Sequence, residues 1–239
     1  MRTRRDLSSP WGYRVWFDES EFDALTDEAR ERGGVALFAS GSGVDVDELL
    51  LRVYGITPDF AANLPPGILG RTLFYPDGRI EIELNRELGE AASNSRSARR
   101  RLRSTLAHEC AHVVEHGHLH LIDTTGGLFE DEPRAAARVL CRSESIFNRG
   151  TDDWWEYQAN RGMSSLLLPK SLVGRVVAEV LSRRGLETIE AALRRGAGKE
   201  VVDEVSEIFD ASFEMTLYRL QGLGFIPSDV RQGALAFGE

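Results

Sequence analysis

The sequence has no run of apolar residues long enough to cross a membrane, and it contains only two cysteines, Cys110 and Cys141. A membrane-spanning helix needs about 20 apolar residues in a row, so we expect none here. Two cysteines cannot form a disulfide framework, and both are expected to be reduced thiols. The basic N-terminus, residues 1–5, is not followed by an apolar stretch. We therefore expect no secretory signal and a cytoplasmic protein.

Basic residues are also in the minority. The chain has 29 Lys and Arg against 38 Asp and Glu, a formal net charge of −9, which repels nucleic acid unless a basic patch is segregated. The arginines within 96–103 are better explained as a solvated helix start that pairs with the protein's own acids. The segment 199–222 has the order of a helix-turn-helix but is mostly acidic. We expect no direct nucleic-acid binding.

The chain of 239 residues, 42% of them hydrophobic, is long enough to bury a substantial core. Three parts are expected: an N-terminal arm and helix (1–34), a core (35–170) and a helical C-terminal segment (171–239). Helices are expected over 19–32, 45–55, 97–116, 133–147, 152–168, 171–184, 186–195, 199–209 and 212–222. Strands are expected over 35–39, 71–75 and 79–84, and a loop over 56–70. This order predicts an α+β fold.

The strand over 79–84 alternates apolar and acidic residues, which predicts one buried and one solvated face. Two interpretations stay open for it. It is either an edge that binds an extended substrate through main-chain hydrogen bonds, or an ordinary half-buried strand.

All five histidines fall between His108 and His120, and the block starts with the pattern H-E-x-x-H at 108–112. On a helix, positions i and i+4 lie on one face about one turn apart. His108 and His112 can therefore reach one metal ion, while Glu109 can reach a water molecule on that ion and act as its base. Two histidines, one carboxylate and an open position make a hydrolytic zinc site.

The third ligand has more than one candidate. His118 has the spacing of the last histidine in the motif H-E-x-x-H-x-x-G-x-x-H. That motif needs glycine for a sharp turn at the position where this chain has Glu115, so His118 is disfavoured.

The other candidate is Glu156, which shares a helix face with Asn160. An acid from a second helix completes many zinc sites with two histidines, and Asn160 could orient one of the histidines. On pattern alone, Glu156 could equally be a solvated acid in the first turn of its helix, and Asp152 and Asp153 lie close by. Cys110, on the opposite helix face from His108, is expected to be a core thiol.

The stretch Thr105-Leu-Ala-His-Glu-Cys-Ala-His112 resembles the active-site helix of the ImmA/IrrE family of zinc metallopeptidases. Residues 156–160, followed by Leu166-Leu-Leu-Pro169, resemble the family's second signature, E-x-x-A-N. Residues 44–56 and 212–226 resemble its N-terminal helix and its helical segment after the catalytic part. The chain departs from the family in the long stretch between the signatures and at Gly162, where a bulkier residue is expected.

The resemblance implies a zincin-like core of the gluzincin type, followed by a helical, helix-turn-helix-like segment. It implies that His108, His112 and Glu156 bind Zn²⁺ and that Glu109 is the general base. It also implies a substrate: a helix-turn-helix repressor that is cut to derepress genes of a mobile element or a stress response.

The expected reaction is hydrolysis of a peptide bond in a protein substrate. A second group must stabilise the oxyanion, and Tyr75, Tyr157, His116 and His118 are its candidates. The alternative function is a non-catalytic regulatory module that binds a repressor or toxin partner. Glu109 argues against this alternative, because binding alone does not require a base. No pattern in the sequence specifies an oligomeric state.

Overall fold

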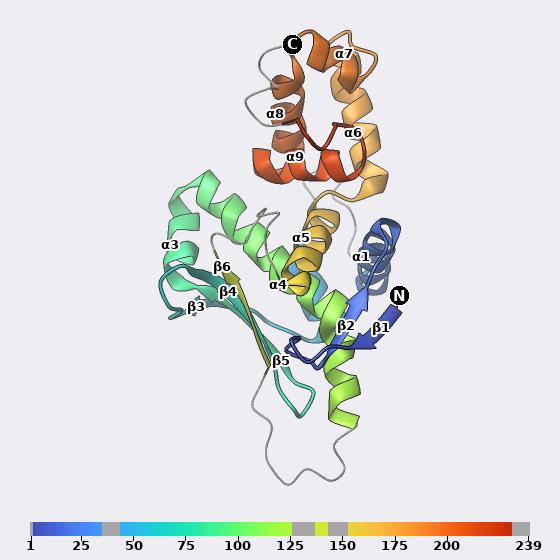
Figure 1. Ribbon diagram of the computed structural model, residues 1–239. Coiled ribbons are helices and arrows are strands. Elements are labelled where there is room, and N and C mark those ends of the chain that lie inside the picture. The colour runs from blue at the N-terminus through green and yellow to red at the C-terminus, as the bar shows by residue number, and fades with distance from the viewer. Residues whose placement is uncertain (1, 35–43, 126–136, 143–152, 231–239) are drawn as a thin grey trace. The chain divides into compact units, whose positions relative to one another are not determined.

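The computed structural model describes residues 2–34, 44–125, 137–142 and 153–230, and it has the expected α+β class (Figure 1). The strands are β1 (Arg2–Arg5), β2 (Tyr13–Trp16), β3 (Asp59–Ala62), β4 (Ile68–Phe74), β5 (Ile80–Asn85) and β6 (Ala137–Arg142). The helices are α1 (Glu19–Gly33), α2 (Val46–Leu49), the π-helical η1 (Leu50–Tyr54), α3 (Arg86–Asn94), α4 (Arg96–Thr125), α5 (Trp154–Leu167), α6 (Lys170–Arg183), α7 (Ile189–Arg194), α8 (Gly198–Phe209) and α9 (Phe213–Gly222).

The N-terminal arm is an antiparallel hairpin of β1 and β2, with Arg2 opposite Trp16. Its connection carries Trp11, which is 1% exposed and belongs to a core cluster with Phe74, Leu119 and Trp154. The hairpin is therefore anchored by a large aromatic side chain, whose burial is among the strongest single contributions to a small core.

The main sheet has the strand order β3-β5-β4-β6. Strand β5 pairs in parallel with β3 and antiparallel with β4, so it is an internal strand. Strand β4 pairs with β5 from Ile80 to Leu84, and β3 pairs with β5 at Glu83 and Asn85, so the interpretation of 79–84 as a substrate-binding edge fails where β3 occupies the other side. The turn from β4 to β5 closes with Tyr75 N donating to Arg79 O at 2.8 Å.

Three further expectations for this part are corrected. Residues 56–70 were expected to be a loop, but β3 and the start of β4 form there. Helix α3 was not expected. Residues 137–142 were expected to be helical, but they form β6 on the free side of β4; pairing with an existing strand outweighs local propensity. The strand expected over 35–39 lies outside the described residues.

The longest helix, α4, packs across the sheet against β4, β5 and β6 (Figure 1). It continues to Thr125, well beyond the expected end at 116. Residues 104–113 are all buried, so the H-E-x-x-H pattern lies in the part of α4 that the sheet and α5 enclose.

The chain divides into two compact units, and the boundary between them lies within α5, between Met163 and Ser164. The first holds the N-terminal hairpin, the sheet and α4. The second holds α6 to α9, close to the four helices expected there. Ser212 caps α9 by accepting from Met215 N at 3.1 Å, and Thr188 caps α7 by accepting from Ala191 N at 3.1 Å.

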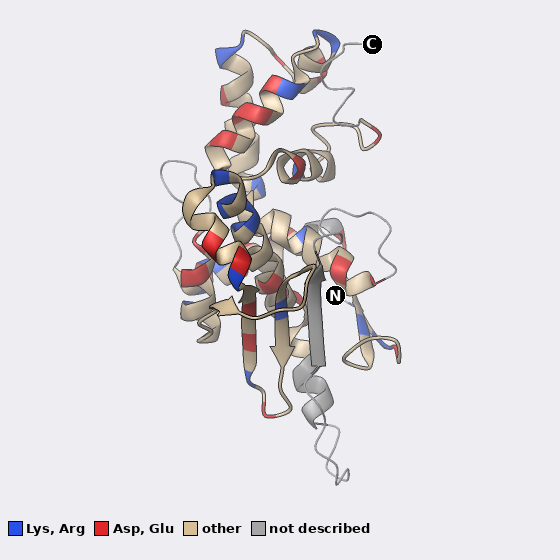
Figure 2. Ribbon diagram, turned by 90° about the vertical axis from the view of Figure 1, so that its left-hand side faces the viewer, with Lys and Arg blue, Asp and Glu red and all other residues tan. Residues whose placement is uncertain are grey.

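Within this second unit, α8 and α9 are joined by Asp210–Ser212, and acids outnumber bases among their charged residues. Figure 2 colours the charged residues of the chain. The two cations of these helices already have partners. Lys199 Nζ lies 2.8 Å from Asp203 Oδ2, and Arg219, 3% exposed, donates to Leu168 O at 2.9 Å. Among the described residues, no helix combines the length and apolar character of a membrane span.

Candidate metal centre

Two histidines of α4 and one glutamate of α5 converge in the first unit. His108 and His112 are fully buried and Glu156 is 5% exposed. His108 Nε2 lies 3.2 Å from Glu156 Oε2, His112 Nε2 lies 3.3 Å from Glu156 Oε1, and the two Nε2 atoms are 3.1 Å apart. One ligand atom from each residue lies within 4.8 Å of the others, so this group could hold a metal ion.

The three side chains of this group offer electron pairs but few hydrogens to share between them, which favours the binding of a cation. Neither oxygen of Glu156 accepts a hydrogen bond from any described residue. Unprotonated imidazole nitrogens and a carboxylate are all electron-pair donors, and such buried groups are costly without a partner. Burial raises the pKa of Glu156, but the two histidine rings, whose Nε2 atoms lie 3.2 and 3.3 Å from its oxygens, outweigh burial, and the pKa falls below its ordinary value. The carboxylate is thus ionised and ready to ligate a cation.

Glu109 lies next to this group and is fully buried. The hydroxyl of Thr72 on β4 donates to Glu109 Oε2 at 2.6 Å. The other oxygen, Oε1, has no hydrogen-bond partner within the described parts of the chain. Burial raises the pKa of Glu109 to about 8, against the opposing effects of His108 and Thr72. A carboxyl with one fixed and one free oxygen suits proton transfer.

Close approach of β4 to α4 makes this contact between Thr72 and Glu109. At Gly70, two residues earlier on the same strand face, a Cβ atom would lie 2.8 Å from Glu109 Oε1 and 2.9 Å from Thr105 Cγ2. Only glycine leaves that space open. Neither Gly70 nor Thr72 was predicted from the sequence, since the contact joins residues 37 apart.

A second set of polar residues on α5 supports the histidines. Asn160 Oδ1 lies 3.1 Å from His108 Nδ1, which is the position considered for it above. Gln158 Oε1 lies 2.9 Å from His116 Nε2, and His116 Nδ1 lies 3.2 Å from His112 Nδ1. Burial lowers the pKa of His116 well below its ordinary range, so this ring is neutral.

Gly162 of α5 is explained by its neighbour on α4. A Cβ atom there would lie 2.0 Å from Glu115 Oε1 and 2.9 Å from Ala111 Cβ. The space that a bulkier side chain at position 162 would fill is occupied by the side chain of Glu115. This carboxyl is fully buried, neither oxygen has a hydrogen-bond partner among the residues described, and burial raises its pKa well above the ordinary value.

Other candidates for the site are not part of the group. Helix α4 continues straight through Glu115 and Gly117, so no turn carries His118 back to the first two histidines. Asp153 is exposed, and Asp152 lies outside the described residues. Cys110 is a fully buried thiol, as expected.

The contacts of the residues proposed to stabilise the oxyanion show which of their polar groups are already engaged. Both ring nitrogens of His116 face protein partners, so it is not free to bind a substrate. Tyr75 donates its hydroxyl to Glu81 Oε2 at 2.6 Å. Tyr157 is 46% exposed, and no described contact engages its hydroxyl.

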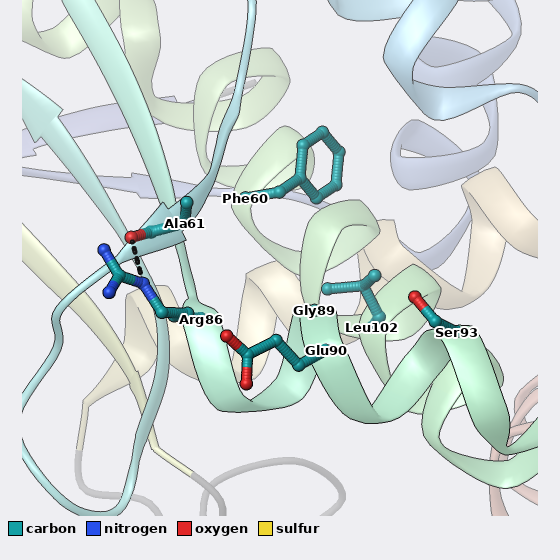
Figure 3. Close-up of a pocket in the computed structure, with 7 residues that line it drawn as sticks. All are labelled: Phe60, Ala61, Arg86, Gly89, Glu90, Ser93 and Leu102. Carbon is teal, nitrogen blue, oxygen red and sulfur yellow. Dashed lines mark hydrogen bonds between the residues drawn. The ribbon is translucent and has the colours of Figure 1, made fainter.

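A pocket of about 530 Å³ lies elsewhere in the first unit, between β3, α3 and α4 (Figure 3). Arg86 Nε donates to Ala61 O at 3.2 Å at one side of it, and the exposed Phe60 forms another side. None of the predicted site residues lines this pocket.

Neither a scan against protein-family models nor a search of curated proteins finds a match to this chain. The resemblance to the ImmA/IrrE family therefore depends on the sequence patterns described above, chiefly the two signatures.

Proposed function

We propose that this chain is a zinc-dependent endopeptidase of the ImmA/IrrE type, with a zincin-like core and a helix-turn-helix-like C-terminal segment. The observation that carries the proposal is the buried convergence of His108, His112 and Glu156 beside Glu109. The donor set fits zinc, which prefers imidazole and carboxylate ligands and keeps an open position in catalytic sites. The orphaned oxygens of Glu156 support the same conclusion.

In the proposed reaction, His108, His112 and Glu156 hold the ion. Bound zinc supplies Lewis acidity to the peptide carbonyl and to the attacking water. Glu109 accepts a proton from that water at its free oxygen, Oε1, and later delivers it to the leaving nitrogen as the C–N bond breaks. Thr72 holds Oε2, so the carboxylate keeps one orientation through both transfers.

The proposed substrate is a protein, namely a transcriptional repressor of the helix-turn-helix type. The resemblance, and the acidic character of α8 and α9, support recognition of a DNA-binding protein over recognition of DNA itself. Cleavage in the cytoplasm would relieve repression of genes of a mobile element or a stress response.

The test is a Glu109→Gln variant. It keeps the volume of the side chain and a hydrogen-bond acceptor for Thr72, but it cannot take a proton. We expect it to retain zinc and its folded structure and to lose cleavage by at least about 100-fold, the usual contribution of a general base. Glu87→Gln, at an exposed position of α3, is the matched control and should cleave as the wild type does.

The assay co-expresses each variant with any helix-turn-helix repressor that is encoded beside the gene for this chain, and it identifies the products by mass spectrometry. Labelling of new N-termini across the proteome covers substrates encoded elsewhere. Full activity of Glu109→Gln would contradict the peptidase proposal. Tight binding of an intact repressor by both wild type and variant would favour a non-catalytic regulatory module.

A further inference from the structure

The N-terminal hairpin is connected to the metal-binding group by an unbroken line of buried hydrogen bonds. Gln158 Nε2 donates to Val15 O at 2.9 Å, and Gln158 Oε1 lies 2.9 Å from His116 Nε2. His116 Nδ1 lies 3.2 Å from His112 Nδ1, and His112 Nε2 faces Glu156 at 3.3 Å. In Figure 1, β2 lies beside α4 and α5, which supply the other members.

In this series of hydrogen bonds, the donor and acceptor of one bond determine the donor and acceptor of the next. The carbonyl of Val15 can only accept, so the amide nitrogen of Gln158 must face it and its oxygen must face His116. His116 therefore donates from Nε2 to that oxygen, and its Nδ1 is left as an acceptor. The hydrogen between the two rings then belongs to His112 Nδ1, and His112 Nε2 keeps a free electron pair directed at the metal-binding group.

The opposite arrangement would disable the ligand. If His112 carried its hydrogen on Nε2, that hydrogen would occupy the space between His112 and Glu156, and no metal ion could bind there. Its Nδ1 would then meet the acceptor Nδ1 of His116, which leaves two electron pairs face to face in a buried site.

Packing holds the intermediate ring in place. The ring of Trp11 lies 4.9 Å from the ring of His116, and the ring of Trp154 lies 5.4 Å from it at 90°. His116 thus has little freedom to rotate away from either hydrogen bond.

We propose that His116 and Gln158 are positioning residues that, together with the Val15 carbonyl, hold His112 in the tautomer that binds the metal. The other histidine, His108, is supported separately by Asn160. The N-terminal hairpin therefore contributes to metal affinity through a main-chain atom, although no residue of it reaches the metal-binding group. This inference rests on the metal site of the proposed function but not on peptidase activity.

The direct test is the tautomer of His112 in the metal-free full-length chain, measured by ¹⁵N NMR of the imidazole nitrogens. We expect hydrogen on Nδ1 in the wild type, and a mixture of tautomers or the Nε2–H form in Gln158→Met. A wild-type His112 with its hydrogen on Nε2 would overturn the proposal, whether or not any variant folds and whether or not zinc is the native metal.

Zinc affinity, measured by competition with a chromophoric chelator, gives the second readout. We expect Gln158→Met and His116→Phe to bind zinc about 10–100-fold more weakly, as is typical when the support of a ligand is removed. His116→Asn places an amide oxygen near the position of Nδ1 and should restore most of the affinity. Gln158→Glu keeps the acceptor for His116 but cannot donate to Val15, so an intermediate loss is expected.

The matched control is His118→Asn, the same substitution two residues further along α4. His118 is not a member of the series of hydrogen bonds that joins Val15 to His112. It should bind zinc as the wild type does. An equal loss in His118→Asn, or unchanged affinity in both Gln158→Met and His116→Phe, would contradict the proposal. If the wild type binds no zinc, the proposed function fails, and the tautomer measurement still decides this inference.

Discussion

At the scale of single residues, the site is an unusual accumulation of buried ionisable groups. Over little more than two helical turns, α4 places five ionisable side chains in the interior, all fully buried: His108, Glu109, His112, Glu115 and His116. Burying a charge without a partner is unfavourable, so each group must be neutral, paired or bound to an ion. His108 and His112 are paired with Glu156, which lies beside both rings. Glu109 is partly stabilised by the hydrogen bond that it accepts from Thr72.

Glu115 is the exception, because no described residue hydrogen-bonds to its carboxyl. The Nε2 atom of His116 lies 4.0 Å from Glu115 Oε2. Burial raises the pKa of Glu115 well above the ordinary value of 4.5, which means that the folded chain holds this proton more tightly than the unfolded chain does.

The consequence is a pH-dependent stability. Below pH 4.5 both states are protonated at Glu115 and its contribution is complete. As the pH rises through 4.5 the unfolded chain ionises first, so the free energy of unfolding falls until the folded-state pKa is reached. Glu115→Met should therefore stabilise the protein by about 1–3 kcal/mol at pH 4, the cost of burying an unpaired polar group, and by more at pH 7.5, where ionisation of Glu115 stabilises the unfolded wild type.

The measurement is urea unfolding of wild type, Glu115→Met and Glu115→Gln between pH 4 and 8, under identical metal-free conditions. Both variants lack the titrating group, so each should unfold with less pH dependence than the wild type. A stability difference between wild type and Glu115→Met that stays constant over this range would contradict the account.

At the scale of elements, the decisive contact is between β4 and α4. Gly70 allows the strand to approach the helix closely enough for Thr72 to bond Glu109. A Cβ atom at position 70 would meet Glu109, Thr105 and also Leu84 Cδ2 at 3.1 Å, so the strand, the helix or both would have to move.

Gly70→Ala should therefore destabilise the protein by about 1–3 kcal/mol, as overpacking of a core does, and it should also reduce activity by displacing Glu109. The control is Gly117→Ala on α4, where the added atom would lie an ordinary 3.9 Å from Ile80 Cδ1. Because alanine favours a helix over glycine by up to about 1 kcal/mol, Gly117→Ala should be neutral or stabilising. The stability of both variants is measured by thermal unfolding. If Gly70→Ala is as stable as Gly117→Ala, the close contact between β4 and α4 at Gly70 is not needed for stability, and the prediction is wrong.

The elements also show which features a single sequence can predict. The H-E-x-x-H pattern predicts a helix with His108 and His112 on one face, because that geometry is local. The pairing of Glu115 with Gly162, and of Thr72 with Glu109, joins residues far apart in the chain. Such pairs carry no local signal. Strand β6 was missed for the same reason, since its pairing with β4 is a tertiary interaction.

At the scale of the whole molecule, the first unit gathers the hairpin, the sheet, α4 and the start of α5 around the metal-binding group, and the second unit consists of α6 to α9. Two candidates for the third ligand competed in the sequence, Glu156 and His118, and Asp152 and Asp153 lie close to the first of them. Only the fold distinguishes them, because it sets which residue of α5 faces the histidines of α4. Since the ion would join α4 to α5, metal binding should also stabilise the folded chain.

The most direct test of the account is the zinc content of the purified full-length chain, measured by elemental analysis on the wild type and on Glu156→Ala. Glu179→Ala, at an exposed acid of α6, is the control. We predict about one zinc ion per chain in the wild type and in Glu179→Ala, with zinc lost or greatly weakened in Glu156→Ala. A wild type without zinc after reconstitution, or a Glu156→Ala protein that retains it fully, would contradict the assignment of this metal centre.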